Sequence, residues 1–429
     1  MRSRRSVLAG LGALGGAGLA GCSALPVGPS EDERADVSLP TDVVESLSWP
    51  PSPFPAAVPE SLATGHEERT TELLAGVPED PSVPNGAVAE EIRADRERAA
   101  ARLDDAIDEP WPTGRLSAWR SRRAAAATVR GAYRAATGED DAGTVDVNRQ
   151  AIRDALASSE AGHVYHASSP VEAVLVHAPV ENLFAECRRR VRPDPTYPGD
   201  QVAAPFQAGE VVGEVERADA TLTDARGLLD AYLEGRDDTA PQWSSLIETA
   251  NRLRFAVGRS RSTVDGFLDV DEPPFDGDFE GTPARTLFYE ASRQVSATAD
   301  GFDRHRDDGD CATAVVEAGR ALAAVETLET AVEGIRDGAY RDSATVESVT
   351  RTAERAREAI TAIDEHENRQ LATQIARPAL ATFEYIPNRI ERGYADAPRV
   401  QGDLARVELY ARVVPAATDF VAERLEDSG

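Results

Sequence analysis

The sequence contains no lysine. All 46 basic residues are arginine, and they face 75 acidic residues, which gives a formal net charge of −29. Aromatic residues make up only 6% of the chain, and methionine occurs once in 429 residues. Because an acidic surface repels the phosphate backbone of nucleic acid, we expect no nucleic-acid partner.

The acidic excess has two possible physical meanings. An acidic surface attracts basic partners, but it also keeps a protein hydrated in concentrated salt, where a Debye length of about 3 Å nearly abolishes self-repulsion. The acidic residues are spread along the whole chain and do not form one block. This distribution favours adaptation to a high-salt environment.

Long apolar runs are also missing. A membrane-spanning helix needs about 20 apolar residues in succession, and no segment of the sequence reaches that length. The longest candidate, residues 7–20, is short and rich in glycine. It follows a basic start that contains Arg2, Arg4 and Arg5. A basic start followed by a short apolar segment is typical of a secretory signal.

Two motifs refine this signal. Residues 3–8, SRRSVL, resemble the twin-arginine export pattern, with Arg4 and Arg5 as the arginine pair, and residues 19–22, LAGC, resemble a lipobox. The resemblance implies a twin-arginine signal peptide over residues 1–21, export by the twin-arginine machinery, and a covalent lipid on Cys22. The chain is then expected on the outer face of the cytoplasmic membrane, where long acyl chains hold it in the lipid.

Residues 22–57 are rich in proline, serine and acidic residues. Such a segment buries little apolar surface, so we expect an extended or disordered linker between the lipid and the folded part. In its composition the whole chain resembles the exported twin-arginine lipoproteins of extremely halophilic archaea. Beyond residue 22 this resemblance is one of composition, and it implies an environment and no activity.

Cysteine occurs three times. With Cys22 assigned to the lipid, Cys187 and Cys311 remain. A disulfide is permitted outside the cell, but twin-arginine cargo folds before export in a reducing compartment. Two buried free thiols are therefore the expected outcome.

Helical periodicity dominates the rest of the chain. Apolar residues recur at steps of three and four from Val315 to Ile335 and again from Val346 to Ile363. Such stripes are typical of amphipathic helices, with Gly338 after the first and an N-cap expected at Asp342 or Ser343. We predict an all-α fold, a large antiparallel helical bundle or bundles of about ten to twelve helices.

Two proline-rich stretches, residues 192–205 and 269–283, are expected to interrupt the helices. The first divides an N-terminal helical region, residues 58–195, from a C-terminal region, residues 206–429, although the two regions can also form one domain. Prolines within helical patterns are expected to end or kink their helices, and these prolines are Pro179, Pro378, Pro387 and Pro415.

Imidazole and carboxylate groups gather in one part of the chain, and these groups belong to Glu160, His163, His166, His177 and Glu181. Helical bundles hold divalent or iron ions with such groups on facing helices, so these five residues form a candidate metal site. The alternative is that His163 and His166 are polar residues near a helix end, where cations are favoured.

Other candidates have simpler explanations. His66, followed by two glutamates, is expected on a solvated surface. Zinc-protease, nucleophile-elbow, phosphate-loop and dinucleotide motifs do not occur in the sequence. The candidate core anchors are Trp111, Trp119, Tyr133, Tyr165, Phe184 and Trp243.

The sequence therefore leads to three functional hypotheses. The first is a non-enzymatic, lipid-anchored protein that binds an envelope partner or takes part in an envelope assembly. The second is a metal- or solute-capturing lipoprotein that feeds a transporter. The third is a hydrolase with scattered carboxylates, which an acidic background neither favours nor excludes.

Overall fold

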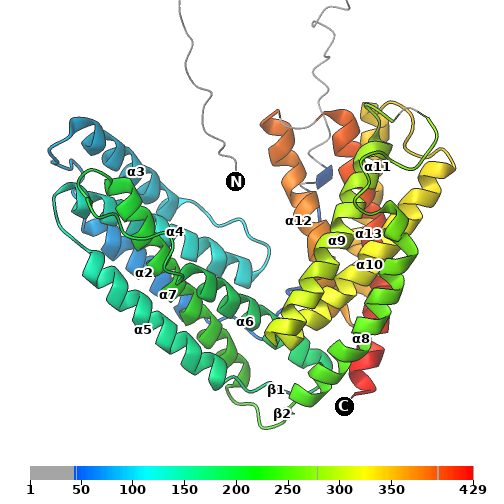
Figure 1. Ribbon diagram of the computed structural model, residues 1–429, viewed down its shortest axis with the longest axis horizontal. Coiled ribbons are helices and arrows are strands. Elements are labelled where there is room, and N and C mark those ends of the chain that lie inside the picture. The colour runs from blue at the N-terminus through cyan, green and yellow to red at the C-terminus, as the bar shows by residue number, and fades with distance from the viewer. Residues whose placement is uncertain (1–42, 45, 278, 394–395, 429) are drawn as a thin grey trace, which may run out of the picture. The chain divides into compact units, whose positions relative to one another are not determined.

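The computed structural model describes residues 43–44, 46–277, 279–393 and 396–428. Within them the chain is almost entirely helical, and the twelve helices from α2 to α13 confirm the predicted all-α fold (Figure 1). No helix in this part of the chain combines the length and the apolar character that membrane crossing requires. Arg4, Arg5 and Cys22 lie outside the described residues.

Helices α2 to α7 form a first bundle, drawn in blue to green in Figure 1. Its closest pair is α4 and α7, with α2 and α3 packed on α4, and α5 and α6 packed on α7. Proline at the first helical positions starts α4, α6 and α7, where a missing N–H costs no hydrogen bond. The bounds are α2 Glu60–Ala75, α3 Gly86–Asp104, α4 Pro112–Ala136, α5 Ala142–Ala161, α6 Pro170–Arg190 and α7 Pro205–Leu233.

Helices α8 to α13 form a second bundle around α10. Alanine and valine dominate α10, and it packs against α8, α9, α13 and α6, so residues on all its sides are buried. The bounds are α8 Trp243–Val264, α9 Pro283–Asp308, α10 Cys311–Arg336, α11 Val346–Thr361, α12 Arg369–Glu391 and α13 Ala397–Glu426, with short 3-10 helices at Asp265–Phe267 and Ala362–Glu365.

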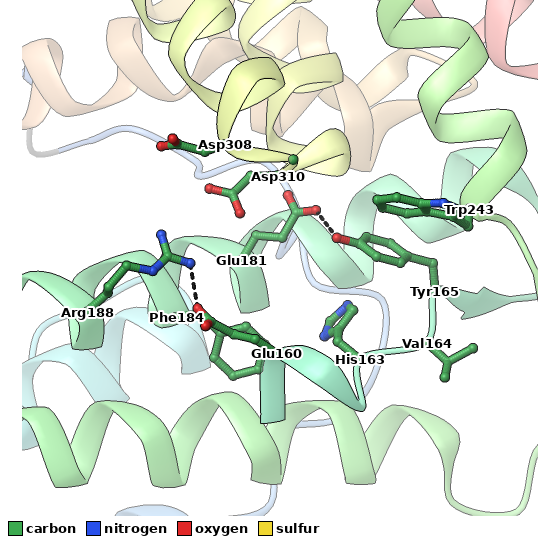
Figure 2. A pocket seen from close by; sticks show the side chains of 11 residues that line it. Glu160, His163, Val164, Tyr165, Glu181, Phe184, Arg188, Trp243, Asp308 and Asp310 are labelled. Carbon is green, nitrogen blue, oxygen red and sulfur yellow. Dashed lines mark hydrogen bonds and ion pairs between the residues drawn. The ribbon is translucent and has the colours of Figure 1, made fainter. Parts of the chain in front are cut away.

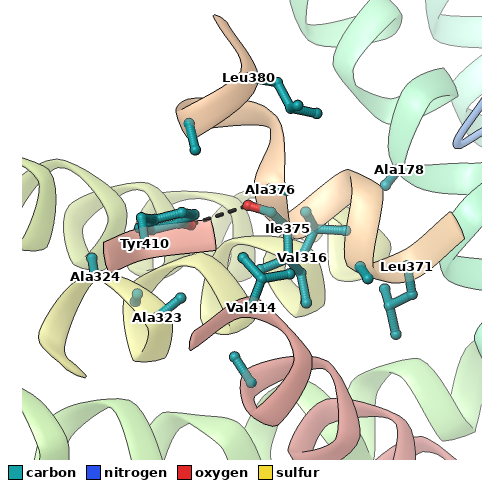
Figure 3. Close-up of a cluster of buried hydrophobic side chains, with 14 of the residues drawn as sticks. Ala178, Val316, Ala323, Ala324, Leu371, Ile375, Ala376, Leu380, Tyr410 and Val414 are labelled. Carbon is teal, nitrogen blue, oxygen red and sulfur yellow. Dashed lines mark hydrogen bonds between the residues drawn. The ribbon is translucent and has the colours of Figure 1, made fainter. Parts of the chain in front are cut away.

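The two bundles share one apolar core where α6 meets α10, α12 and α13. Ala178 of α6 lies beside Val316, Leu371 and Ile375 of the second bundle (Figure 3). The Tyr410 hydroxyl, fully buried, donates a hydrogen bond of 3.1 Å to the Ile375 carbonyl. Residues 39–429 accordingly form one compact unit.

The described C-terminal part of the predicted linker, within residues 22–57, packs on the folded part. Val44 and Phe54 are buried in the shared core, and Trp111 Nε1 donates a hydrogen bond of 2.9 Å to the Pro50 carbonyl. The prediction of an unfolded segment is therefore wrong for its described C-terminal part. The prediction gave weight to the many prolines and too little to the apolar residues between them, which pack on the core. The segment before residue 43 lies outside the described residues.

The predicted boundary between two regions at residues 195–206 is also misplaced. Helix α7 follows this proline-rich stretch, yet it packs chiefly against α4 and α6 of the first bundle. The stretches 192–205 and 269–283 do interrupt the helices as predicted. The first bundle instead ends with α7, and the second begins with α8. Between them lies β2, Ala240–Pro241, which pairs antiparallel with β1, His166–Ala167.

Several local predictions need correction. Of the two outcomes expected for Pro179, Pro378, Pro387 and Pro415, ending a helix does not occur, because all four lie inside helices. The N-cap of α11 is Thr345, which forms a reciprocal capping box with Ser348, and not Asp342 or Ser343. His66 is 1% exposed rather than solvated, because its Nε2 lies 2.8 Å from Oδ1 of the buried Asp224.

Candidate functional site

A cavity of about 610 Å³ lies where the two bundles meet (Figure 2). The first bundle contributes the end of α5, the residues that follow it, and α6. The second bundle contributes Trp243 at the start of α8 and the turn between α9 and α10. Residues from four separate parts of the sequence therefore line one space.

The segment between α5 and α6 is held in place by its backbone. Helix α5 ends at Ala161, and the chain then pairs as β1 with β2. Gln242 N donates a hydrogen bond of 2.7 Å to the Tyr165 carbonyl, and the Ser169 hydroxyl accepts one of 3.2 Å from Glu172 N at the start of α6. These bonds fix His163 and Tyr165 at the cavity wall.

Glu181 is the buried acid of the site. Its Oε1 accepts hydrogen bonds from the Tyr165 hydroxyl at 2.7 Å and from Ala312 N at 3.1 Å, and its Oε2 accepts one from Thr313 N at 2.6 Å. Burial raises the pKa of Glu181 to about 7, against the opposing effect of these hydrogen bonds. The carboxylate thus accepts hydrogen bonds from two backbone N–H groups in the first turn of α10. The N–H groups of a first turn have no acceptor within their own helix.

His163 and His177 contact each other directly. His177 Nε2 lies 3.2 Å from the His166 carbonyl, which only accepts, so Nε2 carries the proton and Nδ1 is left as an acceptor. His163 Nε2 lies 3.0 Å from this Nδ1 and is therefore the donor. His163 Nδ1 is then an unprotonated acceptor, and it is buried without a partner among the described residues.

Both imidazoles are neutral at physiological pH. Burial lowers the pKa of His163 to about 4, and burial together with the neighbouring His163 lowers that of His177 to about 3. A proton added to His177 Nδ1 would also break the hydrogen bond between the rings, because that nitrogen would then no longer accept. The pair is therefore a fixed, uncharged part of the wall.

Aromatic rings form one side of the cavity. The ring centres of Tyr165 and Trp243 are 4.9 Å apart, and those of His163 and Tyr165 are 4.5 Å apart. Phe184 continues this wall from α6. Trp243 is 43% exposed, so its expected role as a core anchor is wrong, whereas Phe184 and Trp111 are buried as expected.

Carboxylates also line the cavity. In the part of the chain that the structure describes, Asp310 Oδ2 lies 3.3 Å from His305 Nδ1, and Asp308 has no ion pair. Glu160 is paired with Arg188 at 2.5 Å (Figure 2). The carboxylates of Asp308 and Asp310 thus leave the cavity with an excess of negative charge.

The predicted metal ligands are brought together only in part. Glu160, His163 and Glu181 line the cavity, His177 lies behind His163, and His166 contributes its backbone carbonyl. Nowhere among the described residues do three or more His, Cys, Asp or Glu side chains form a group that could hold a metal ion. In the structure Glu160 pairs with Arg188, His163 and His177 bond to each other, and Glu181 caps the start of α10.

Sequence reasoning missed the acids of the α9–α10 turn. Asp308 and Asp310 flank Gly309, whose φ of 84° ends α9 in the left-handed conformation. They lie more than a hundred residues from His163, and the acidic background hides them. The direct contact of Glu181 with α10 is what places them at the cavity.

The two thiols near the site are structural. Cys187 and Cys311 are both buried and free, as expected. Burial raises the pKa of each thiol to about 12. The three arginines that follow Cys187 therefore do not activate it, because a reactive cysteine needs a lowered pKa and exposure.

Comparison with known families divides the chain at the same place as the structure. A family model described as Domain of unknown function (DUF8262) matches residues 61–238, and one described as Domain of unknown function (DUF8264) matches residues 243–423. These segments correspond to the first and second bundles, and the cavity lies where they meet. No curated protein and no solved structure matches the chain.

Proposed function

We propose that this chain is an exported, lipid-anchored binding protein, and that its cavity between the bundles takes a small organic cation. The observation that carries the proposal is the placement of aromatic faces and carboxylates in one cavity. Tyr165 and Trp243 present ring surfaces, and Asp308 and Asp310 supply negative charge without an arginine partner. Aromatic faces and carboxylates together are the usual recognition elements for ammonium groups.

The volume of the cavity suits such a ligand. A space of about 610 Å³ is within the range of small-molecule sites, which are mostly apolar with a few polar groups that fix orientation. An alkylated ammonium ion has an apolar surface for the rings and a charge for the aspartates. A metal ion needs several converging donors, and an anion would meet the charge of the aspartates.

The titratable polar groups of the cavity are engaged in structural hydrogen bonds, and this supports a binding function over a catalytic one. Glu181 accepts from two N–H groups that hold α10 to α6 and from the Tyr165 hydroxyl, and His163 and His177 are engaged with each other. The pKa values of these groups are strongly perturbed, and perturbed groups occur in structural networks as well as in active sites. Here each has a defined structural partner.

The anchor in this proposal comes from the sequence alone. The motifs around Arg4, Arg5 and Cys22 support export and lipid attachment. An anchored binding protein would hold its solute at the outer membrane face, where an envelope protein or a transporter can receive it.

The test is calorimetric titration of the chain with tetramethylammonium chloride in concentrated potassium chloride. We expect saturable binding that weakens at least about tenfold in Asp308→Asn, because the charge opposite the ligand is lost. Asp307→Asn is the matched control, since Asp307 neighbours Asp308 but pairs with Arg306 and does not line the cavity. Absence of binding, or equal affinity in both variants, would contradict the proposal.

A further inference from the structure

A second cavity, of about 340 Å³, lies between α6 and α12 and is closed on one side by Pro53 and Phe54. In contrast to the first cavity, arginine is the main charged residue of its lining. Arg120, Arg320 and Arg377 line it against the single carboxylate of Glu186. In a chain of net charge −29, this local reversal of charge is an unusual feature.

Two of the arginines are already engaged. Arg120 Nη1 lies 2.5 Å from Asp224 Oδ2, and the Arg320 guanidinium donates to the Gln374 carbonyl and to Glu317. Glu186 is likewise engaged, since it pairs with Arg190 and Arg217. None of these three groups requires a ligand.

Arg377 differs from them because it has no ion pair and no hydrogen bond in the described residues. Its guanidinium lies 5.3 Å from the centre of the Trp111 ring, and its side chain is exposed at the cavity. Glu109 and Glu384 act on it only from a distance and form no ion pair with it.

Gln374 is the second unengaged group. It is 5% exposed, its backbone carbonyl accepts from Arg320, and its side-chain amide forms no hydrogen bond in the described residues. Gln374 and Arg377 are three residues apart on α12, so their side chains share one helical face.

We infer that this cavity is a binding site for a small oxyanion, held by the guanidinium of Arg377 and the amide of Gln374. The planar fork of an arginine matches a carboxylate or phosphate with two parallel hydrogen bonds. An amide adds one further donor from the same helical face. The anion would supply the counter-charge that the protein does not place beside Arg377.

The experiment is thermal unfolding of the full chain in concentrated potassium chloride, with and without sodium phosphate or sodium acetate, against an equal addition of sodium chloride. We expect phosphate or acetate to raise the Tm by roughly 2–5 °C at concentrations far above the Kd. The increase should vanish in Arg377→Gln and persist in Arg351→Gln, an exposed arginine on α11 that pairs with Glu347.

The variant also separates binding from folding. If Arg377→Gln changes the Tm in chloride alone, the shift caused by the oxyanion is still measured within that variant, and its loss supports the site. Arg377→Lys keeps the charge but loses the fork, so it should retain only part of the shift. No shift in the unmodified chain, or an equal shift in Arg377→Gln, would overturn the inference.

Discussion

The Glu181 carboxylate on α6 accepts a hydrogen bond of 2.6 Å from Thr313 N at the start of α10, and this bond joins the two bundles. The same side chain accepts from Ala312 N and from the Tyr165 hydroxyl. A single acid therefore caps a helix of the second bundle and fixes the aromatic wall of the first. The geometry of the cavity depends on this residue.

Replacing Glu181 with alanine leaves two backbone N–H groups and one hydroxyl without their acceptor. We expect Glu181→Ala to lower the free energy of unfolding by about 2–4 kcal/mol, because buried unsatisfied groups are costly. Denaturant unfolding in concentrated salt measures it. Glu326→Ala, at an exposed position of α10, is the control and should change stability by less than about 0.5 kcal/mol. Equal effects of the two variants would rule out the bridging role.

The imidazole pair gives the site a pH dependence of known sign. The pKa values of His163 and His177 lie below 6.5, at about 4 and about 3, so the unfolded chain binds protons first as the pH falls. The contribution of the pair to stability is complete above pH 6.5 and is lost as the pH falls towards 4. For one ring this loss is of the order of 3 kcal/mol.

The His163→Gln variant isolates this contribution, because a glutamine amide can still donate to His177 Nδ1 while one titrating group is removed. Its stability should fall less than that of the unmodified chain between pH 7 and pH 4.5. Glu181 acts with the opposite sign, since its raised pKa of about 7 contributes stability at low pH that is lost as the pH rises from 4.5 through 7. Parallel pH profiles for both chains would refute the role of the pair.

The export motifs give a prediction for living cells. Arg4→Lys combined with Arg5→Lys should keep the chain inside the cell, and Cys22→Ser should release it from the membrane fraction, because the covalent lipid is lost. Cell fractionation and mass spectrometry of the N-terminal peptide measure both outcomes. Arg2→Lys is the control for the arginine pair. Membrane association that survives Cys22→Ser would contradict lipid attachment.

Helical periodicity sufficed to predict the fold class and several helices. The stripes from Val315 and from Val346 coincide with α10 and α11, because apolar spacing of three and four residues determines which helical face is buried. Clusters of prolines marked the helix interruptions at residues 192–205 and 269–283, but isolated prolines were a poor guide to helix ends. Pro179 and Pro415 lie inside α6 and α13. Each proline removes one backbone hydrogen bond, and the burial of these helices against their neighbours offsets that loss.

The candidate site was predicted only in part for a related reason. The residues around His163 and Glu181 do gather at one cavity, as the sequence cluster indicated. Their partners Trp243, Asp308 and Asp310 come from the other bundle, and no local pattern relates them. Whether Glu181 binds a metal ion or caps a helix is decided by the position of α10, which is a tertiary contact.

Close packing of α4 against α7 provides a stability test that is independent of the cavity. These two helices approach through glycines, and a Cβ atom on Gly209 would lie 2.4 Å from the Thr128 carbonyl oxygen and 3.0 Å from Ala132 Cβ. The clash is with backbone and cannot be relieved by a rotamer change. We therefore expect Gly209→Ala to force the helices apart and to lower the free energy of unfolding by about 2–3 kcal/mol.

The matched control is Gly258→Ala on α8. Gly258 is exposed, and a Cβ atom there would have no neighbour within 4 Å. Because alanine loses less backbone entropy in a helix than glycine, this variant should gain about 0.5–1 kcal/mol. The two substitutions are chemically identical, so opposite signs in denaturant unfolding can arise only from the surroundings. A gain in stability for Gly209→Ala would mean that α4 and α7 are not in the close contact that holds the first bundle together.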